Sequence, residues 1–197
     1  MQSSELKFPP MSGRQIEGIA CHVLRAYQPD VLEGKASFDI ERFVDVHLED
    51  LTGVQPDYLD LPVGVHGMTD QNRMIIQRLL AETRRSYKFL RSTMAHETGH
   101  AILHSHVLRK FGARQFFEQK SQKTKSGGIE LFRRKDLKAY EDPEWQAWRF
   151  ARALMMPEVV MRRLVQSGIR LVQIAEHFDV NVPFVESRLH DLKITYK

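Results

Sequence analysis

The stretch His96-Glu97-Thr98-Gly99-His100 carries more information about the fold than any other part of the sequence. A helix turns about 100° per residue, so side chains four positions apart lie about 40° apart on one face. Two imidazoles at that spacing can bind one tetrahedral metal ion, and the adjacent Glu97 can reach a water there without binding the metal. We predict His96 and His100 as metal ligands and Glu97 as a general base. The alternative is two solvated histidines on a surface helix.

The sequence around this motif predicts a long helix over residues 82–108. Gly99 is unfavourable inside a helix by ~1 kcal/mol relative to Ala. We therefore expect its missing side chain to permit close approach, either of a substrate or of another strand. The opposite face of the helix offers apolar residues for packing, namely Met94, Ala95, Ala101 and Ile102.

A catalytic zinc needs a third protein ligand and one position left for water. His106 has the spacing of the His-Glu-x-x-His-x-x-Gly-x-x-His peptidases, but Leu103 stands where those proteins have a helix-breaking glycine. If the helix continues, His106 points about 100° away from the middle of the His96/His100 pair, so we reject it. His104 lies on the ligand face one turn beyond His100. It is either a residue that supports the ligands or an ordinary hydrogen-bonded histidine.

Glu144 is the better candidate for the third ligand. It lies in the first turn of a helix that Asp142-Pro143 begins, with Asp as N-cap and Pro at the first position. Ala147 and Ala151 keep the face below it narrow, which would let this helix approach the first one closely. The alternative is that Glu144 only complements the helix dipole.

The remaining sequence predicts mostly helices around a small antiparallel sheet. Residues 61–67 and 73–77 flank a turn-like stretch, as in a β-hairpin, and 129–132 is a further candidate strand. We divide the chain into a tail (1–12), a catalytic domain (13–165) and a C-terminal helical segment packed on it (166–197). Other helices are expected over 13–27, after a cap at Ser37, from Pro143 to Pro157, and near 158–166, 170–178 and 183–192.

Composition favours a cytoplasmic protein. The sequence has one cysteine, Cys21, which excludes an intramolecular disulfide and which we expect to be buried among apolar residues. No apolar run approaches the roughly 20 residues that span a bilayer, and the N-terminus lacks a secretory signal, so we expect no membrane association. The net charge is +4, and residues 107–138 hold ten Lys/Arg against three Asp/Glu. This basic segment either borders the cleft or is a solvated loop.

A DNA-binding regulator is the main competing interpretation. Residues 171–189 have the apolar spacing of a helix-turn-helix, but residues 169–197 contain four basic and four acidic side chains. Glu186 and Asp191 would repel phosphates, so we do not expect direct DNA binding. A metal-dependent toxin or an inactive sensor is a third interpretation, and the intact Glu97 argues against an inactive protein.

Two motifs resemble those of the ImmA/IrrE family of metallopeptidases. The family pairs His-Glu-x-Gly-His-x-x-Leu-His with Glu-x-x-Ala-Asn-x-Phe-Ala-x-x-Leu-Leu-Met-Pro. Here residues 96–104 read HETGHAILH and residues 144–157 read EWQAWRFARALMMP, within a resemblance that covers roughly 14–192. Thr98 replaces a usual aliphatic residue and Trp148 the usual Asn, which would alter how the second helix is held.

The resemblance implies a zincin-like α+β fold, with His96, His100 and Glu144 as ligands and Glu97 as the base. Two imidazoles and a carboxylate suit Zn²⁺ well, although Mn²⁺ is also compatible. The implied activity is that of a zinc-dependent endopeptidase that cleaves one specific protein. Members of the family commonly cleave a helix-turn-helix repressor of a mobile element or stress regulon. The resemblance therefore implies a substrate of that kind.

Overall fold

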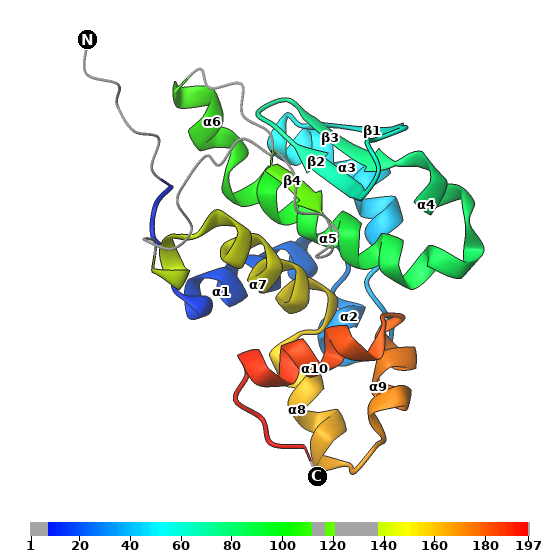
Figure 1. Cartoon of the computed structure of the whole chain (residues 1–197). Helices are drawn as coiled ribbons and strands as arrows, with labels where there is room; N and C mark the ends of the chain where they lie inside the picture. The colour runs from blue at the N-terminus through cyan, green and yellow to red at the C-terminus, as the bar shows by residue number, and fades with distance from the viewer. Residues whose placement is uncertain (1–7, 112–116, 121–137, 197) are drawn as a thin grey trace.

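The central helix α5 (Tyr87–Leu103) is surrounded by the other elements in this computed structural model, which describes residues 8–111, 117–120 and 138–196. Figure 1 shows the sheet on one side of α5, the helices α1 (Gly13–Tyr27) and α7 (Pro143–Met155) on another, and the C-terminal helices at the lower end. Nearly every residue from Leu90 to Leu103 is buried. A polar motif on this helix is therefore an interior feature, which excludes the surface-helix alternative.

The sheet contains four strands among the described residues, in the order β1-β3-β2-β4. The predicted hairpin is confirmed, since β2 (Val65–Thr69) pairs antiparallel with β3 (Arg73–Gln77). However, β1 (Gln55–Leu59) runs parallel to β3, so the sheet is mixed and not purely antiparallel. The fourth strand, β4 (Phe117–Lys120), pairs antiparallel with β2 and was not predicted. The predicted α+β, mostly helical class is confirmed.

The N-terminal helices differ slightly from the prediction. Helix α1 has the expected bounds and begins with a capping box between Ser12 and Gln15. Helix α3 (Ile40–Thr52) is capped by Asp39, whose carboxylate accepts from the Arg42 amide, and not by Ser37. A carboxylate next to the helix competes better for the free amides than a hydroxyl two residues earlier. A short helix α2 (Asp30–Glu33) lies between α1 and α3.

The predicted helix over 82–108 is divided into shorter pieces. Helix α4 (Arg78–Glu82) and a 3₁₀ turn precede α5, and α6 (Ser105–Phe111) follows it. The break falls at His104, the C-cap of α5, whose φ of −122° is not helical. The assumption of a continuous helix, used above to reject His106, was therefore wrong.

The second half of the chain follows the prediction closely. Asp142 caps α7 and Pro143 opens it. The three short helices are α8 (Glu158–Gln166), α9 (Leu171–Phe178) and α10 (Val182–Asp191). The predicted strand at 129–132 lies outside the described residues. No helix in the described part of the chain is both long and apolar enough to cross a bilayer.

The C-terminal helices share one apolar core with the N-terminal helices. Ile174, Phe178 and Val185 belong to the same buried cluster as Ile16 and Phe43. The boundary proposed at 165/166 stays a prediction. Cys21 is only half-buried, because it lies beside the buried face of α1, which is formed by Ile16, Ala20, Val23 and Leu24.

Arg188 on α10 ties the C-terminal segment to α1. Its side chain is fully buried, and it donates to the Glu17 carboxylate (2.5 Å) and to the Met156 carbonyl (2.8 Å). Burying a charge is costly unless that charge is paired and hydrogen-bonded. Arg188 therefore has a structural role and does not face solvent.

Replacing Arg188 with Met should destabilise the protein by about 3 kcal/mol, because Glu17 would lose its partner while staying only partly in water. Arg162 provides a matched control, since it pairs with Glu158 on the exposed side of α8. We expect Arg162→Met to change stability by less than about 1 kcal/mol. The free energy of unfolding from denaturant titration measures both, and equal effects would contradict a structural role for Arg188.

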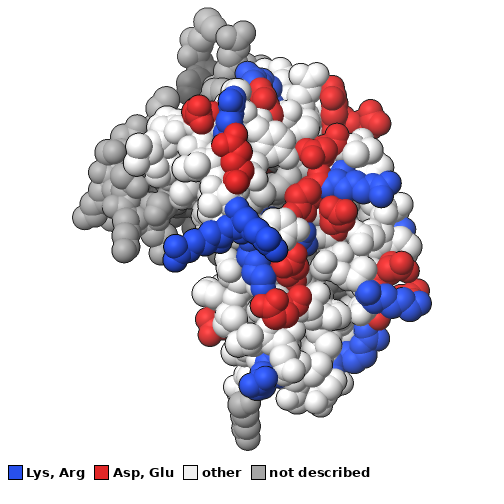
Figure 2. All heavy atoms as spheres, turned by 90° about the vertical axis from the view of Figure 1, so that its right-hand side faces the viewer, with Lys and Arg blue, Asp and Glu red and all other residues white. Residues whose placement is uncertain are grey.

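Surface charge is mixed on the face that Figure 2 presents. Basic and acidic side chains alternate there over short distances and form no large area of one sign. Most of the basic segment 107–138 lies outside the described residues, so its predicted position beside the cleft stays a prediction.

Candidate metal centre

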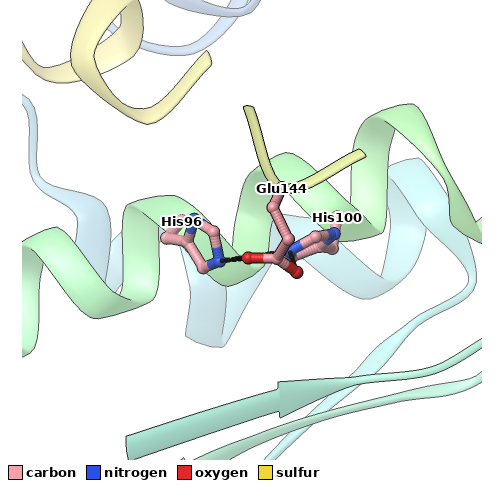
Figure 3. A group of neighbouring side chains, drawn as sticks. All are labelled: His96, His100 and Glu144. Atoms are coloured by element: carbon pink, nitrogen blue, oxygen red, sulfur yellow. Dashed lines mark hydrogen bonds and ion pairs between the residues drawn. The ribbon is translucent and has the colours of Figure 1, made fainter. Parts of the chain in front are cut away.

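Three side chains from two helices converge at the middle of α5. His96 and His100 project from one face of that helix, and Glu144 reaches them from the first turn of α7 (Figure 3). The Nε2 atoms of the two histidines are 3.1 Å apart. The Glu144 carboxylate oxygens lie 3.4 Å from Nε2 of His96 and 3.2 Å from Nε2 of His100. All the donor atoms fall within 4.8 Å of one another, a grouping that could hold a metal ion.

The contact between α5 and α7 brings Glu144 within reach. A Cβ atom built on Gly99 would lie 2.9 Å from the carbonyl oxygen of Ala147 and 3.0 Å from its Cα. The two backbones therefore touch where the sequence has Gly on one helix and Ala on the other. Ala151 is also completely buried one turn further along α7. The close approach at Gly99 is made by the backbone of helix α7, and not by either of the expected partners, a substrate or a strand.

Gly99→Ala should destabilise the protein by about 1–3 kcal/mol, because the added methyl group meets backbone atoms of α7 that cannot move aside freely. Gly18 is the matched control. It also lies inside a helix, but nothing is within 4 Å of the position of its Cβ. Gly18→Ala should stabilise the protein by up to ~1 kcal/mol through helix propensity. Thermal unfolding of both variants would reveal the opposite signs, and a neutral or stabilising Gly99→Ala would contradict this packing.

Glu97 is completely buried between α5 and the sheet. Its Oε2 accepts a hydrogen bond from the Thr69 hydroxyl at 2.6 Å, while its Oε1 has no hydrogen-bond partner among the described residues. Gly67 on β2 makes room for it, since a Cβ there would lie 2.6 Å from Oε1. Burial raises the pKa of Glu97 well above its usual value, although the Thr69 hydrogen bond opposes that shift. Glu97 is not part of the three-residue grouping, which fits a base and not a ligand.

The electrostatics of the cluster favour the protonation states of His96 and Glu144 that bind metals. Burial lowers the pKa of His96 to about 4, although the hydrogen bond with Glu144 opposes this. Burial alone would raise the pKa of Glu144, but the nearby His100 and His96 outweigh it and hold that pKa well below its usual value. At neutral pH His96 is then neutral and Glu144 ionised, as metal ligands must be.

His104 supports His100, as one of the two sequence interpretations expected. Its Nδ1 lies 3.0 Å from Nδ1 of His100, and its Nε2 lies 2.9 Å from Oε1 of Gln146. Both ring nitrogens are therefore engaged away from the side where the ligands converge. His106, by contrast, is exposed and does not belong to the cluster, so its rejection stands although the reasoning was wrong.

His96 is held differently from His100. The indole of Trp148 packs on its ring, with centroids 4.1 Å apart and planes inclined by 31°. Nδ1 of His96 is buried and has no hydrogen-bond partner in the part of the chain that the structure describes. The two histidines therefore differ on the side away from the ligands: the ring of His96 is stacked on Trp148, whereas Nδ1 of His100 meets His104.

Sequence reasoning missed Thr69, Gly67 and Gln146. Thr69 and Gly67 come from a strand remote in sequence, and nothing in their local pattern indicates a role. Gln146 had a usable signal, because it shares a helix face with Phe150 and is thus a polar residue on an apolar face. Such a residue is usually hydrogen-bonded in the interior.

The fold and the site define a zincin-like protein, in which a second helix brings a carboxylate to the His-Glu-x-x-His helix. Comparison with family models agrees: residues 44–190 match the peptidase M78 model, described as an IrrE N-terminal-like domain. This match covers well over half of the chain, so the protein belongs to that family, and membership supports a metallopeptidase-type function. A search of curated proteins gave no match.

Proposed function

We propose that this protein is a zinc-dependent endopeptidase in which His96, His100 and Glu144 bind the metal and Glu97 is the general base. The observation that carries the proposal is the convergence of three donor side chains beside a buried carboxylate oxygen without a partner. The bond it would hydrolyse is a peptide bond of a protein substrate.

The donor set fits zinc. Two imidazoles and one carboxylate are the ligands of one common type of catalytic zinc site, which leaves a further position for water or substrate. When bound, zinc would polarise the scissile carbonyl and make a water molecule more acidic. Manganese accepts a similar set, so the choice of zinc is part of the proposal.

Glu97 would move the proton. Thr69 fixes one of its carboxylate oxygens, which leaves Oε1 to accept a proton from the attacking water. After the attack, the same carboxyl group would deliver that proton to the leaving amine. Its burial raises the pKa of Glu97 and thereby increases its basicity.

The proposed substrate is a helix-turn-helix repressor of a mobile element or stress regulon, on the basis of the family resemblance. We expect the protein to act in the cytoplasm, where its single thiol, Cys21, would stay reduced. The test is incubation of the purified zinc-loaded protein with the repressor encoded beside its gene. Cleavage at one site, lost with a chelator and restored by zinc, is expected. Cleavage that resists the chelator would contradict metal dependence.

Direct DNA binding by residues 171–189 is not favoured by the structure. Arg188 is the basic residue in the middle of the second helix, and its guanidinium is already buried against Glu17. Charges on the face shown in Figure 2 are mixed. Gel-shift titration at low salt should therefore show no specific binding to the promoter of the protein's own gene. Tight, salt-sensitive binding that Lys193→Ala abolishes would favour the regulator.

A further inference from the structure

A chain of buried polar groups leads from His100 to main-chain carbonyl oxygens of the N-terminal segment and of the 3₁₀ turn before α7. It runs from Nδ1 of His100 to Nδ1 of His104 (3.0 Å) and from Nε2 of His104 to Oε1 of Gln146 (2.9 Å). It ends where Nε2 of Gln146 meets the carbonyl oxygens of Pro9 (3.0 Å) and Tyr140 (2.8 Å). All three side chains are fully buried or nearly so.

The far end of the chain fixes the direction of every hydrogen bond. Carbonyl oxygens only accept, so the amide group of Gln146 must donate both of its protons to Pro9 and Tyr140. The atom of Gln146 that faces His104 is then its amide oxygen. Because this oxygen accepts, Nε2 of His104 must carry the proton. Burying a charged imidazolium is costly, and the completely buried His104 in its neutral form has a lone pair on Nδ1, which accepts from His100.

From this geometry we infer that His104 and Gln146 are positioning residues that fix His100 as the tautomer with its proton on Nδ1. In that tautomer Nε2 of His100 carries a lone pair on the side that faces Glu144, where the metal would bind. The inference rests on the proposed metal site. It adds a pair of residues that neither touch the metal nor take part in the proton transfer.

The N-terminal segment closes this chain of groups off from water. The ring of Phe8 packs edge-on against that of His104, with centroids 5.1 Å apart, and is itself 6 % exposed. Met11 donates its amide proton to the Tyr140 carbonyl at 2.8 Å, which holds the segment in place. Within residues 8–111, 117–120 and 138–196, His96 has no comparable chain, since its Nδ1 has no hydrogen-bond partner there. His100 should therefore be the better ordered of the two imidazoles.

Two variants of His104 separate its two hydrogen bonds. Asn places an acceptor oxygen near the position of Nδ1 and keeps the contact with His100. Gln places an amide nitrogen near the position of Nε2 and keeps the contact with Gln146. Both are polar and similar in size, so both should fold, and His104→Leu removes both contacts. His106→Ala is the control, because His106 lies two residues away and is exposed.

The measurement is the zinc dissociation constant, obtained by competition with a chromophoric chelator, together with the unfolding midpoint of each metal-free variant. We expect His104→Gln and His104→Leu to bind zinc about 10–100-fold more weakly, and His104→Asn to stay within about 3-fold of wild type. The unfolding midpoint should depend on the contact with Gln146, so the midpoint of His104→Gln should be closer to wild type than that of His104→Asn. The Co²⁺ absorption spectrum should shift in the two weak binders only.

Unchanged affinity in His104→Leu would overturn the inference, as would equal losses in the Asn and Gln variants, which would indicate packing alone. Failure of the wild-type protein to bind zinc would instead overturn the proposed metal site. The two proposals can therefore fail separately.

Discussion

Glu97→Gln is expected to give a folded, zinc-loaded protein that cleaves its substrate about 10²–10⁴-fold more slowly than wild type. The amide has the shape of the carboxylate, so it should keep the contact with Thr69 and the fit against Gly67. It cannot accept a proton at neutral pH. The loss should therefore appear in the rate of cleavage and not in the zinc content, which elemental analysis would measure beside a cleavage time course.

Glu186→Gln is the matched control, because Glu186 is exposed on α10 and its substitution removes the same negative charge from the protein. It should cleave at the wild-type rate. The Glu97→Gln variant should still bind the uncut substrate, which a pull-down of the complex would detect. A wild-type cleavage rate in this variant would mean that the proton acceptor lies elsewhere. Loss of zinc would mean that Glu97 is itself a ligand.

The side chains whose relative positions could be predicted from the sequence are those that helical periodicity fixes. His96, Glu97 and His100 lie within two turns of one helix, so their arrangement follows from spacing alone. The position of Glu144 followed from the signals that begin α7 and from the small residues that follow it. Its distance from the histidines depends on backbone contact at Gly99, which the sequence only suggested.

The parts that were not predicted depend on contacts between segments distant in sequence. Thr69 lies 28 positions from Glu97, and Gln146 lies 42 positions from His104. No local pattern indicates which of many polar residues will meet across such separations. The break of the long helix at His104 has the same origin, because that side chain is held by Gln146 on another helix. Local propensity alone would continue the helix, and tertiary contacts override it.

Removing any one of the three proposed ligands should abolish stable metal binding. Wild-type protein should contain about one zinc per chain. His96→Ala, His100→Ala and Glu144→Gln should each weaken zinc binding by more than ~100-fold, because even residues that only support ligands contribute 10–100-fold. Glu144→Gln is preferred to Ala, since it keeps the volume between the helices and removes the charge.

The control for the ligand set is His106→Ala, which removes an exposed histidine from the adjacent helix. It should keep full zinc content and full activity. Loss of zinc in His106→Ala together with retention in Glu144→Gln would show that the metal is bound by a different third residue. Because both substitutions leave the Gly99–Ala147 contact intact, a changed zinc content cannot be attributed to separation of α5 from α7. Elemental analysis of the four purified variants therefore tests the assignment of each ligand independently of the fold.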